Sequence, residues 1–237
     1  MKAIILAGGL GTRISEETAD KPKPMVEIAG KPILWHLMNI FASQGFKEFI
    51  IATGYKGHVI SDWAQLIDEP WEVTALDTGL ETQTGGRIQM CMESVPGERV
   101  FATYGDGLGS VDLDKLVQFH EMNGLLGTIT AVRPPARFGV LESSNGLVTH
   151  FGEKNQTDSG WINGGFFVLE PQVSRYIHHL DEPFENGAIP RLVSENQLAA
   201  FHHEGFWQPM DTLREKQDLE RFASQTIPPW LEIGMRG

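Results

Sequence analysis

The sequence predicts an α/β fold in which a doubly wound, mostly parallel sheet carries helices on both faces. Strand-like and helix-like patterns alternate through the first half of the chain, which is typical of crossover units that build a parallel sheet. A glycine-rich segment directly follows the first strand-like run, as expected at the carboxyl edge of such a sheet. After Pro134-Pro135 the pattern changes, and Asn145-Gly146 predicts a small antiparallel extension.

The first half supplies the strands of the predicted parallel sheet. Each is a short segment rich in Ile, Val, Phe or Thr, the residue types that favour strands. We expect these strands at residues 2–7, 48–53, 72–77, 99–104 and 127–132.

Helices are expected between these strands and at the end of the chain. The clearest begins at Ile33, carries its apolar residues on one face and stops at Gly45, which easily adopts a left-handed cap. A second covers about 112–122 and ends at Asn123-Gly124, and the last covers 213–222.

In the second half, runs at 138–142 and 147–151 flank Asn145-Gly146 and predict a hairpin. A further apolar run at 166–169 precedes Pro171, which suits the first turn of a helix. There is no internal repeat, linker or low-complexity tract. We therefore expect a single domain over residues 1–237.

The composition excludes several classes of protein. The net charge of −12 opposes binding to nucleic acid and to anionic membranes, and no basic cluster offsets it. Cys91 is the only cysteine, so no internal disulfide can form, which fits a cytoplasmic protein. The apolar run after Lys2 is too short for a signal peptide, and no apolar stretch approaches the roughly 20 residues that span a bilayer.

The glycine-rich segment Leu6-Ala7-Gly8-Gly9-Leu10-Gly11-Thr12-Arg13 is suited to bind phosphate, because glycines let backbone N–H groups approach its oxygens. Arg13 and Lys23 add positive charge beside it. A P-loop would need Gly-Lys-Ser or Gly-Lys-Thr, and a dinucleotide-binding motif would need a small residue at Ile14, although Glu27 has nearly the spacing of a ribose-binding acid. A simple tight turn is the structural alternative.

Two acidic residues are candidate metal ligands. Asp106 follows a predicted strand, at the same edge as the glycine-rich segment, although Asp-Gly is also a common turn. Asp211 precedes the apparent capping box Thr212 to Glu215, where an acid also stabilises a helix start. Together, two such carboxylates and the substrate phosphates are sufficient to hold Mg2+.

Motifs along nearly the whole chain resemble the sugar-phosphate nucleotidylyltransferases, a family of Rossmann-like fold. The resemblance begins with the glycine-rich segment and the run from Lys23 to Ile28. It continues through Gly54-Tyr55-Lys56-Gly57, Asp77-Thr78-Gly79, Thr84-Gly85-Gly86-Arg87, Thr103-Tyr104-Gly105-Asp106-Gly107, Asn163-Gly164-Gly165-Phe166-Phe167 and Gly205-Phe206-Trp207-Gln208-Pro209-Met210-Asp211-Thr212.

The resemblance implies transfer of a cytidylyl group from CTP to glucose 1-phosphate, giving CDP-glucose and pyrophosphate, in a cytoplasmic homo-oligomer. By position in the motifs, the catalytic residues are Arg13, Lys23, Asp106 and Asp211, and the last two hold Mg2+. The half up to about residue 133 would bind the nucleotide and the half from 134 the sugar phosphate. The implied nucleotide-binding residues are Leu6, Ala7, Gly8, Gly9, Gly11, Thr12, Arg13, Lys23, Thr82, Gly85, Arg87 and Gly105. The implied sugar-phosphate-binding residues are Gly139, Glu153, Lys154 and Asn163.

One segment departs from the family pattern and leaves alternatives open. Only residues 58–71 separate Gly57 from the next predicted strand, fewer than in similar enzymes, and such segments often contribute to assembly or cover a site. The same chemistry with another nucleotide or another phosphorylated acceptor is therefore one alternative. A non-catalytic module that binds nucleotide or sugar phosphate is a second, and a nicotinamide oxidoreductase ranks last because of Ile14.

Overall fold

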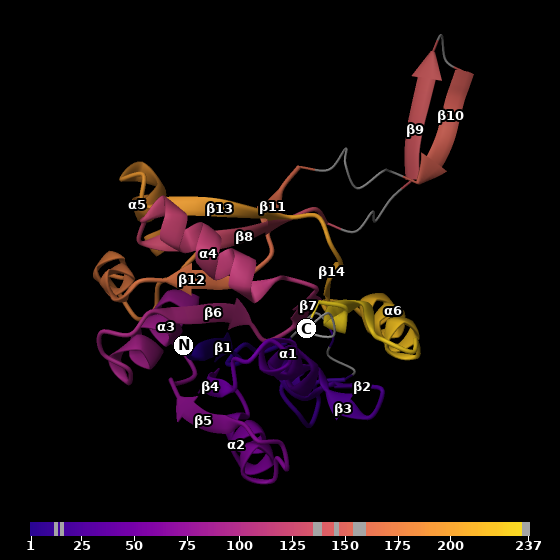
Figure 1. Ribbon diagram of the computed structural model, residues 1–237. Coiled ribbons are helices and arrows are strands. Elements are labelled where there is room, and N and C mark those ends of the chain that lie inside the picture. The colour runs from indigo at the N-terminus through magenta and orange to yellow at the C-terminus, as the bar shows by residue number, and fades with distance from the viewer. Residues whose placement is uncertain (12–13, 15–16, 135–138, 145–146, 154–159, 234–237) are drawn as a thin grey trace.

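The computed structural model describes residues 1–11, 14, 17–134, 139–144, 147–153 and 160–233. Within these residues a central sheet of eight strands organises the molecule (Figure 1). Its strands are β1 (Ala3–Leu6), β4 (Glu48–Thr53), β5 (Glu72–Asp77), β6 (Val100–Tyr104), β8 (Gly127–Val132), β11 (Ile162–Asn163), β12 (Phe167–Leu169) and β13 (Leu198–His203). The spatial order is β11-β8-β12-β6-β1-β4-β5, and β13 pairs with β8.

The strand β1 lies at the centre of a parallel group, with β4 on one side and β6 on the other. The strand β5 extends this group in parallel beyond β4. All five strands predicted in the first half are present, and their bounds agree to within a residue at each end. The mostly parallel sheet is therefore confirmed.

The antiparallel strand β12 separates β6 from β8, an arrangement that the sequence pattern did not predict. The strand β13 was also missed, and it pairs in parallel with β8 along its whole length. Its apolar run is short and contains two alanines, and the strand ends in His202-His203, so it lacks the Ile, Val and Thr residues that mark the other strands. Sheet pairing, not residue propensity, makes this segment a strand.

Helices cover both faces of the sheet. They are α1 (Ile33–Ala42), α2 (Gly57–Gln65), α3 (Thr84–Glu93), α4 (Leu113–Asn123), α5 (Ala188–Ser194) and α6 (Leu213–Ala223). Alternate residues of β1 enter opposite cores: Ile5 packs in the core that contains α1, and Ile4 packs in the core that contains α3. The doubly wound arrangement is thus confirmed, with a separate apolar core on each side of the sheet.

The predicted helix signals act as expected, with one exception. Gly45 (φ +92°) follows the end of α1 and Gly124 (φ +61°) caps α4, both in the left-handed conformation. The side chain of Asp112 accepts a hydrogen bond from the Lys115 backbone at the start of α4. Pro171 begins η4 (Pro171–Tyr176), a 3-10 helix and not an α-helix. Two other 3-10 helices, η2 (Lys23–Met25) and η5 (Pro229–Leu231), lie near the chain ends.

Three small antiparallel sheets complete the fold. The predicted hairpin is confirmed as β9 (Gly139–Ser144) and β10 (Leu147–Glu153), whose turn at 145–146 falls outside the described residues. Figure 1 shows this hairpin well away from the main sheet. The other pairs are β2 (Glu27–Ile28) with β3 (Lys31–Pro32), and β7 (Gly107–Gly109) with β14 (Trp207–Pro209).

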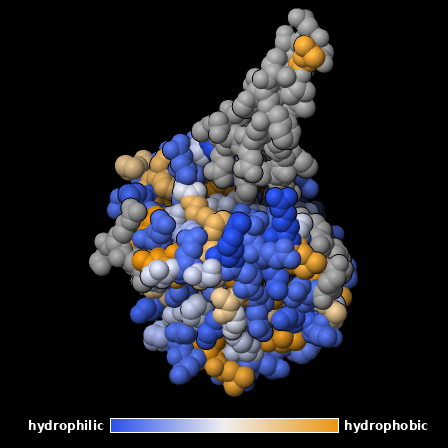
Figure 2. Space-filling view, turned by 90° about the vertical axis from the view of Figure 1, so that its right-hand side faces the viewer, coloured by the Kyte–Doolittle hydropathy of each residue, from blue (hydrophilic) through white to orange (hydrophobic). Residues whose placement is uncertain are grey.

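The surface is polar on the side that Figure 2 shows, where hydrophobic residues form small groups among hydrophilic ones. Scattered exposed apolar residues are ordinary in globular proteins. Among the described residues, no helix combines the length and apolarity needed to cross a bilayer.

Candidate active site

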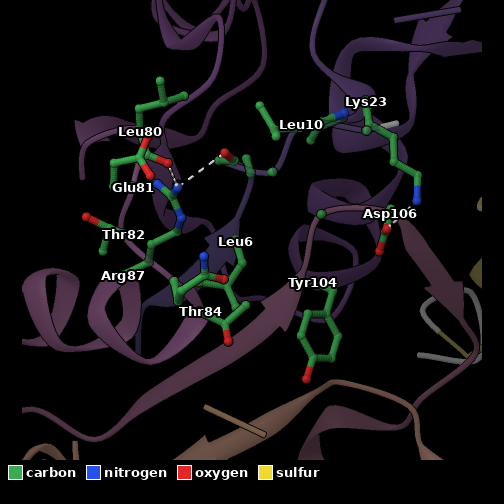
Figure 3. A pocket seen from close by; sticks show the side chains of 17 residues that line it. Leu6, Leu10, Lys23, Leu80, Glu81, Thr82, Thr84, Arg87, Tyr104 and Asp106 are labelled. Atoms are coloured by element: carbon green, nitrogen blue, oxygen red, sulfur yellow. Dashed lines mark hydrogen bonds and ion pairs between the residues drawn. The ribbon is translucent and has the colours of Figure 1, made fainter. Parts of the chain in front are cut away.

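A cleft of about 580 Å³ opens at the carboxyl ends of β1 and β6. Ligands bind at this edge in doubly wound proteins. Figure 3 shows Lys23 and Asp106 at one end and Leu80, Thr82 and Arg87 at the other. The cleft is lined by Leu6, Ala7, Gly8, Gly9, Leu10, Gly11, Lys23, Pro24, Leu80, Glu81, Thr82, Gln83, Thr84, Arg87, Tyr104, Gly105 and Asp106.

The glycines of the first loop lie in three different environments. A Cβ atom on Gly8 would lie 2.2 Å from Cζ of Arg87, so this position has no room for a side chain. Gly11 has a φ of +65°, a conformation that favours glycine. A Cβ atom on Gly9 would meet nothing within 4 Å, because this residue faces open space. The loop therefore presents bare backbone to the cleft at Gly9.

The side chain of Arg87 connects the glycine loop to the ends of two neighbouring strands, β4 and β5. Its guanidinium donates to the carbonyl oxygens of Thr53 (2.7 Å) and Gly8 (3.2 Å) and to the hydroxyl of Thr78. The side chain is 5% exposed, and burial lowers its pKa. Arginine remains charged even so. These contacts make Arg87 part of the cleft floor, and direct contact with the nucleotide stays a prediction.

At the other end of the cleft, Lys23 links the two predicted metal ligands. Its ammonium lies 2.6 Å from Oδ2 of Asp106 and 2.7 Å from Oδ1 of Asp211. Burial by itself lowers the pKa of Lys23, but the charge of Asp106 and the hydrogen bonds to both carboxylates outweigh it and raise the pKa. Lys23 is therefore a cation held between two carboxylates.

Two local structures bring Asp106 and Asp211 together. Asp106 follows β6, and its carbonyl accepts a hydrogen bond of 2.8 Å from the Met210 backbone, which continues the β7–β14 pairing. Asp211 immediately precedes the capping box of α6, in which Thr212 and Glu215 bond to each other's backbone. Glu215 also accepts a hydrogen bond of 2.7 Å from the backbone of Asp211. The backbones that carry both acids are thus fixed by hydrogen bonds.

The donor set at Lys23 fits a magnesium ion held in part by substrate. Two carboxylates converge on a single cationic group, and Mg2+ prefers such oxygen ligands. Over the described part of the chain, no three His, Cys, Asp or Glu residues are grouped as a metal site. A site with two protein ligands would leave the remaining positions to phosphate oxygens and water, as Mg2+ sites commonly do.

A hydrogen-bond network that no sequence motif predicted borders the cleft near Asn163. The hydroxyl of Tyr104 donates to Glu185 (2.5 Å) and accepts from Asn163 (2.7 Å). The other carboxylate oxygen of Glu185 accepts from the Thr84 hydroxyl at 2.7 Å. Burial and the Glu185 charge raise the pKa of Tyr104, so its hydroxyl stays protonated. Glu185 belongs to no recognisable motif. It lies 81 positions from Tyr104 in the sequence, and only the fold brings the two side chains together.

The remaining predicted residues are placed as follows. Gly85 lies outside the cleft lining, and a Cβ atom there would lie 2.6 Å from the Glu182 carbonyl. Gly139 and Glu153 are paired across β9 and β10, and their contact with the sugar phosphate stays a prediction. Thr12, Arg13 and Lys154 lie outside the described residues.

The fold and the cleft define a nucleotide-binding α/β enzyme class, and residues 2–234 match the family model described as nucleotidyl transferase. The chain belongs to this family. It is 46% identical to the glucose-1-phosphate cytidylyltransferases of Salmonella typhi and Salmonella typhimurium, over 97% of this chain and 98% of each relative. The solved inositol-1-phosphate CTP transferase of T. maritima has the same fold, with a TM-score of 0.71 at 15% identity, covering 95% of this chain and 97% of that one.

Proposed function

We propose that the protein transfers a cytidylyl group from CTP to glucose 1-phosphate and releases CDP-glucose and pyrophosphate. The observation that carries the proposal is the Lys23, Asp106 and Asp211 cluster at one end of a cleft walled by bare glycine backbone. The near full-length identity of 46% to enzymes named for these substrates supports the choice of CTP and glucose 1-phosphate.

In the reaction, a phosphate oxygen of glucose 1-phosphate attacks the α-phosphorus of CTP, and pyrophosphate leaves in line. The nucleophile is already an anion at neutral pH, so no general base is needed. Catalysis then depends on positioning and on neutralising charge. The backbone from Gly8 to Gly11 binds the triphosphate, and Lys23 donates to the α-phosphate or the attacking oxygen. Arg13 stabilises the leaving pyrophosphate.

Asp106 and Asp211 would hold Mg2+ together with the substrate phosphates. The bound ion would supply charge neutralisation at the phosphoryl oxygens. Lys23 holds the two carboxylates together. We further propose Thr82 and Arg87 at the nucleotide end, and Asn163 with Gly139, Glu153 and Lys154 toward the sugar phosphate. A single domain, a homo-oligomeric state and a cytoplasmic location also stay predictions.

The decisive experiment measures pyrophosphate release with magnesium for CTP, UTP, dTTP, ATP and GTP, each with glucose 1-phosphate and with other sugar phosphates. Release confined to CTP and glucose 1-phosphate supports the full proposal. Release with another pair supports the same chemistry with different substrates. If no pair releases pyrophosphate but calorimetry shows nucleotide binding, the result would favour a non-catalytic binding module.

The metal assignment predicts that Asp106→Asn and Asp211→Asn each lower kcat by about a hundredfold or more, because each removes one charged ligand. Thermal unfolding should stay cooperative in both variants. Titration of Mn2+ followed by electron paramagnetic resonance, with the nucleotide present, measures ion binding independently of turnover. The exposed Asp62→Asn variant is the control and should match the parent. Normal activity and ion binding in either test variant would contradict the assignment.

A further inference from the structure

Lys56 connects the start of α2 to the segment that follows the glycine loop. Its ammonium donates to the carbonyl oxygens of Thr18, at 3.2 Å, and of Ala19. Because the donor is a charged ammonium, these two hydrogen bonds to the backbone are stronger than bonds from a neutral donor. The Tyr55 ring lies 5.0 Å from the ammonium and adds a cation–π contact.

The segment that Lys56 holds is folded back on the glycine loop. The hydroxyl of Thr18 lies 3.2 Å from the carbonyl oxygens of both Gly11 and Ile14, and Thr18 is 5% exposed. A Cβ atom on Gly11 would lie 3.1 Å from both Thr18 Cγ2 and Lys23 Cβ. Thr18 and Lys23 thus both lie beside Gly11 in the cleft wall, and a shift at Thr18 would disturb its hydrogen bond to the Gly11 carbonyl.

The residues just before α2 contact the glycine loop at a second point. The backbone N–H of Tyr55 donates to the carbonyl of Gly8 at 3.3 Å. Tyr55 thus contacts the glycine loop at Gly8 through its backbone, and Lys56 contacts the segment after the loop, at Thr18 and Ala19, through its side chain. Lys56 itself has a left-handed backbone (φ 51°, ψ 34°) that residues with a Cβ rarely adopt. Surrounding contacts must hold such a conformation, and it often marks a functional segment.

From these contacts we infer that Lys56 is a positioning residue for the phosphate-binding loop: its ammonium fixes Thr18 and Ala19, and through the Thr18 hydroxyl it fixes the carbonyl of Gly11, in the position that receives the nucleotide triphosphate. The inference rests on the proposed function. Lys56 acts through the carbonyls of Thr18 and Ala19 and does not touch the reacting atoms. The alternative is that the contacts of Lys56 contribute only to the stability of the fold.

The substitution Lys56→Gly separates these roles, because glycine accepts the left-handed backbone but lacks the ammonium. We expect the melting temperature to stay at or above that of the parent, while KM for CTP rises about tenfold and kcat changes less than about threefold. Lys56→Arg keeps donors for the two carbonyls and should restore KM to within about threefold of the parent. Lys47→Gln, at an exposed lysine, is the matched control and should leave KM unchanged.

A second measurement does not depend on turnover. Hydrogen–deuterium exchange of residues 17–19 in the nucleotide-free protein should be faster in Lys56→Gly than in the parent, and unchanged in Lys47→Gln. A parental KM or parental exchange rates in Lys56→Gly, or a KM that rises only with a lower melting temperature, would overturn the inference. If the parent shows no turnover with any substrate pair, the proposed function fails, and the exchange measurement alone decides whether Lys56 positions the loop.

Discussion

At the residue scale, neighbouring glycines of one loop serve different purposes. Gly8 is required by the fold, because the guanidinium of Arg87 occupies the space that a side chain would need. Gly9 is required by nothing within the protein, since its surroundings are open. The lack of a side chain at Gly9 therefore matters for the cleft, where it lets the backbone approach a phosphate closely.

This contrast predicts different effects of two alanine substitutions. Gly9→Ala should leave the melting temperature unchanged but raise KM for CTP about tenfold or more, because the new methyl group occupies the space of the substrate. Gly8→Ala should lower the free energy of unfolding by about 1–3 kcal/mol, because it forces Arg87 out of its hydrogen bonds. Urea denaturation and steady-state kinetics measure the two effects. Equal loss of stability in both variants would refute the distinction.

At the element scale, the start of α6 determines where Asp211 lies. Thr212 Oγ1 accepts a hydrogen bond from the backbone of Glu215, and Glu215 in return accepts from the backbones of Thr212 and Asp211. The β7–β14 pairing adjoins this cap and fixes Asp106 against Met210. A common local motif, the capping box, thus also orients a residue of the candidate metal site.

The cap predicts that Thr212→Ala lowers the free energy of unfolding by about 1 kcal/mol, because one N–H group at the helix start loses its partner. Thr212→Ser keeps the hydroxyl and should restore most of that loss. Urea denaturation of both variants is the measurement. If the alanine variant unfolds at the same urea concentration as the parent, the cap does not contribute to stability and the prediction is wrong.

At the scale of the whole molecule, three histidines on separate elements are buried in the fold. His36, His120 and His203 are at most 8% exposed. For each, burial is the main cause of a pKa below the ordinary histidine value of 6.5, although a hydrogen-bonded oxygen partly offsets it. Below about pH 6.5 the unfolded chain therefore binds more protons than the folded protein. Stability contributed by these rings is complete above that pH and is lost as the pH falls.

We expect the free energy of unfolding to decrease between pH 7 and pH 5.5, with each histidine contributing a slope of up to about 1.4 kcal/mol per pH unit. His36→Gln removes one titrating ring and should reduce the slope, whatever its effect on stability at pH 8. Urea denaturation of the parent and of His36→Gln at several pH values measures both slopes, and identical slopes would show that His36 does not titrate in this way.

The sequence by itself determined the parallel half of the sheet, the helices that begin at Ile33 and Leu213, the hairpin and the glycine loop. These features depend on local causes: apolar periodicity, capping residues and turn chemistry act within a few positions of each other. The candidate acids Asp106 and Asp211 came from motif resemblance, because each has an adequate local explanation as a turn or a cap.

Only the tertiary structure decided which distant residues meet. It placed β12 between β6 and β8, joined β13 to the sheet, turned Arg87 toward backbone carbonyls and linked Glu185 to Tyr104. It also brought Lys23 to Asp211 across 188 positions of the chain. Such contacts cannot be read from local sequence. They depend on how the two faces of the shared sheet are buried, because this burial determines which loops meet at the edge of the sheet.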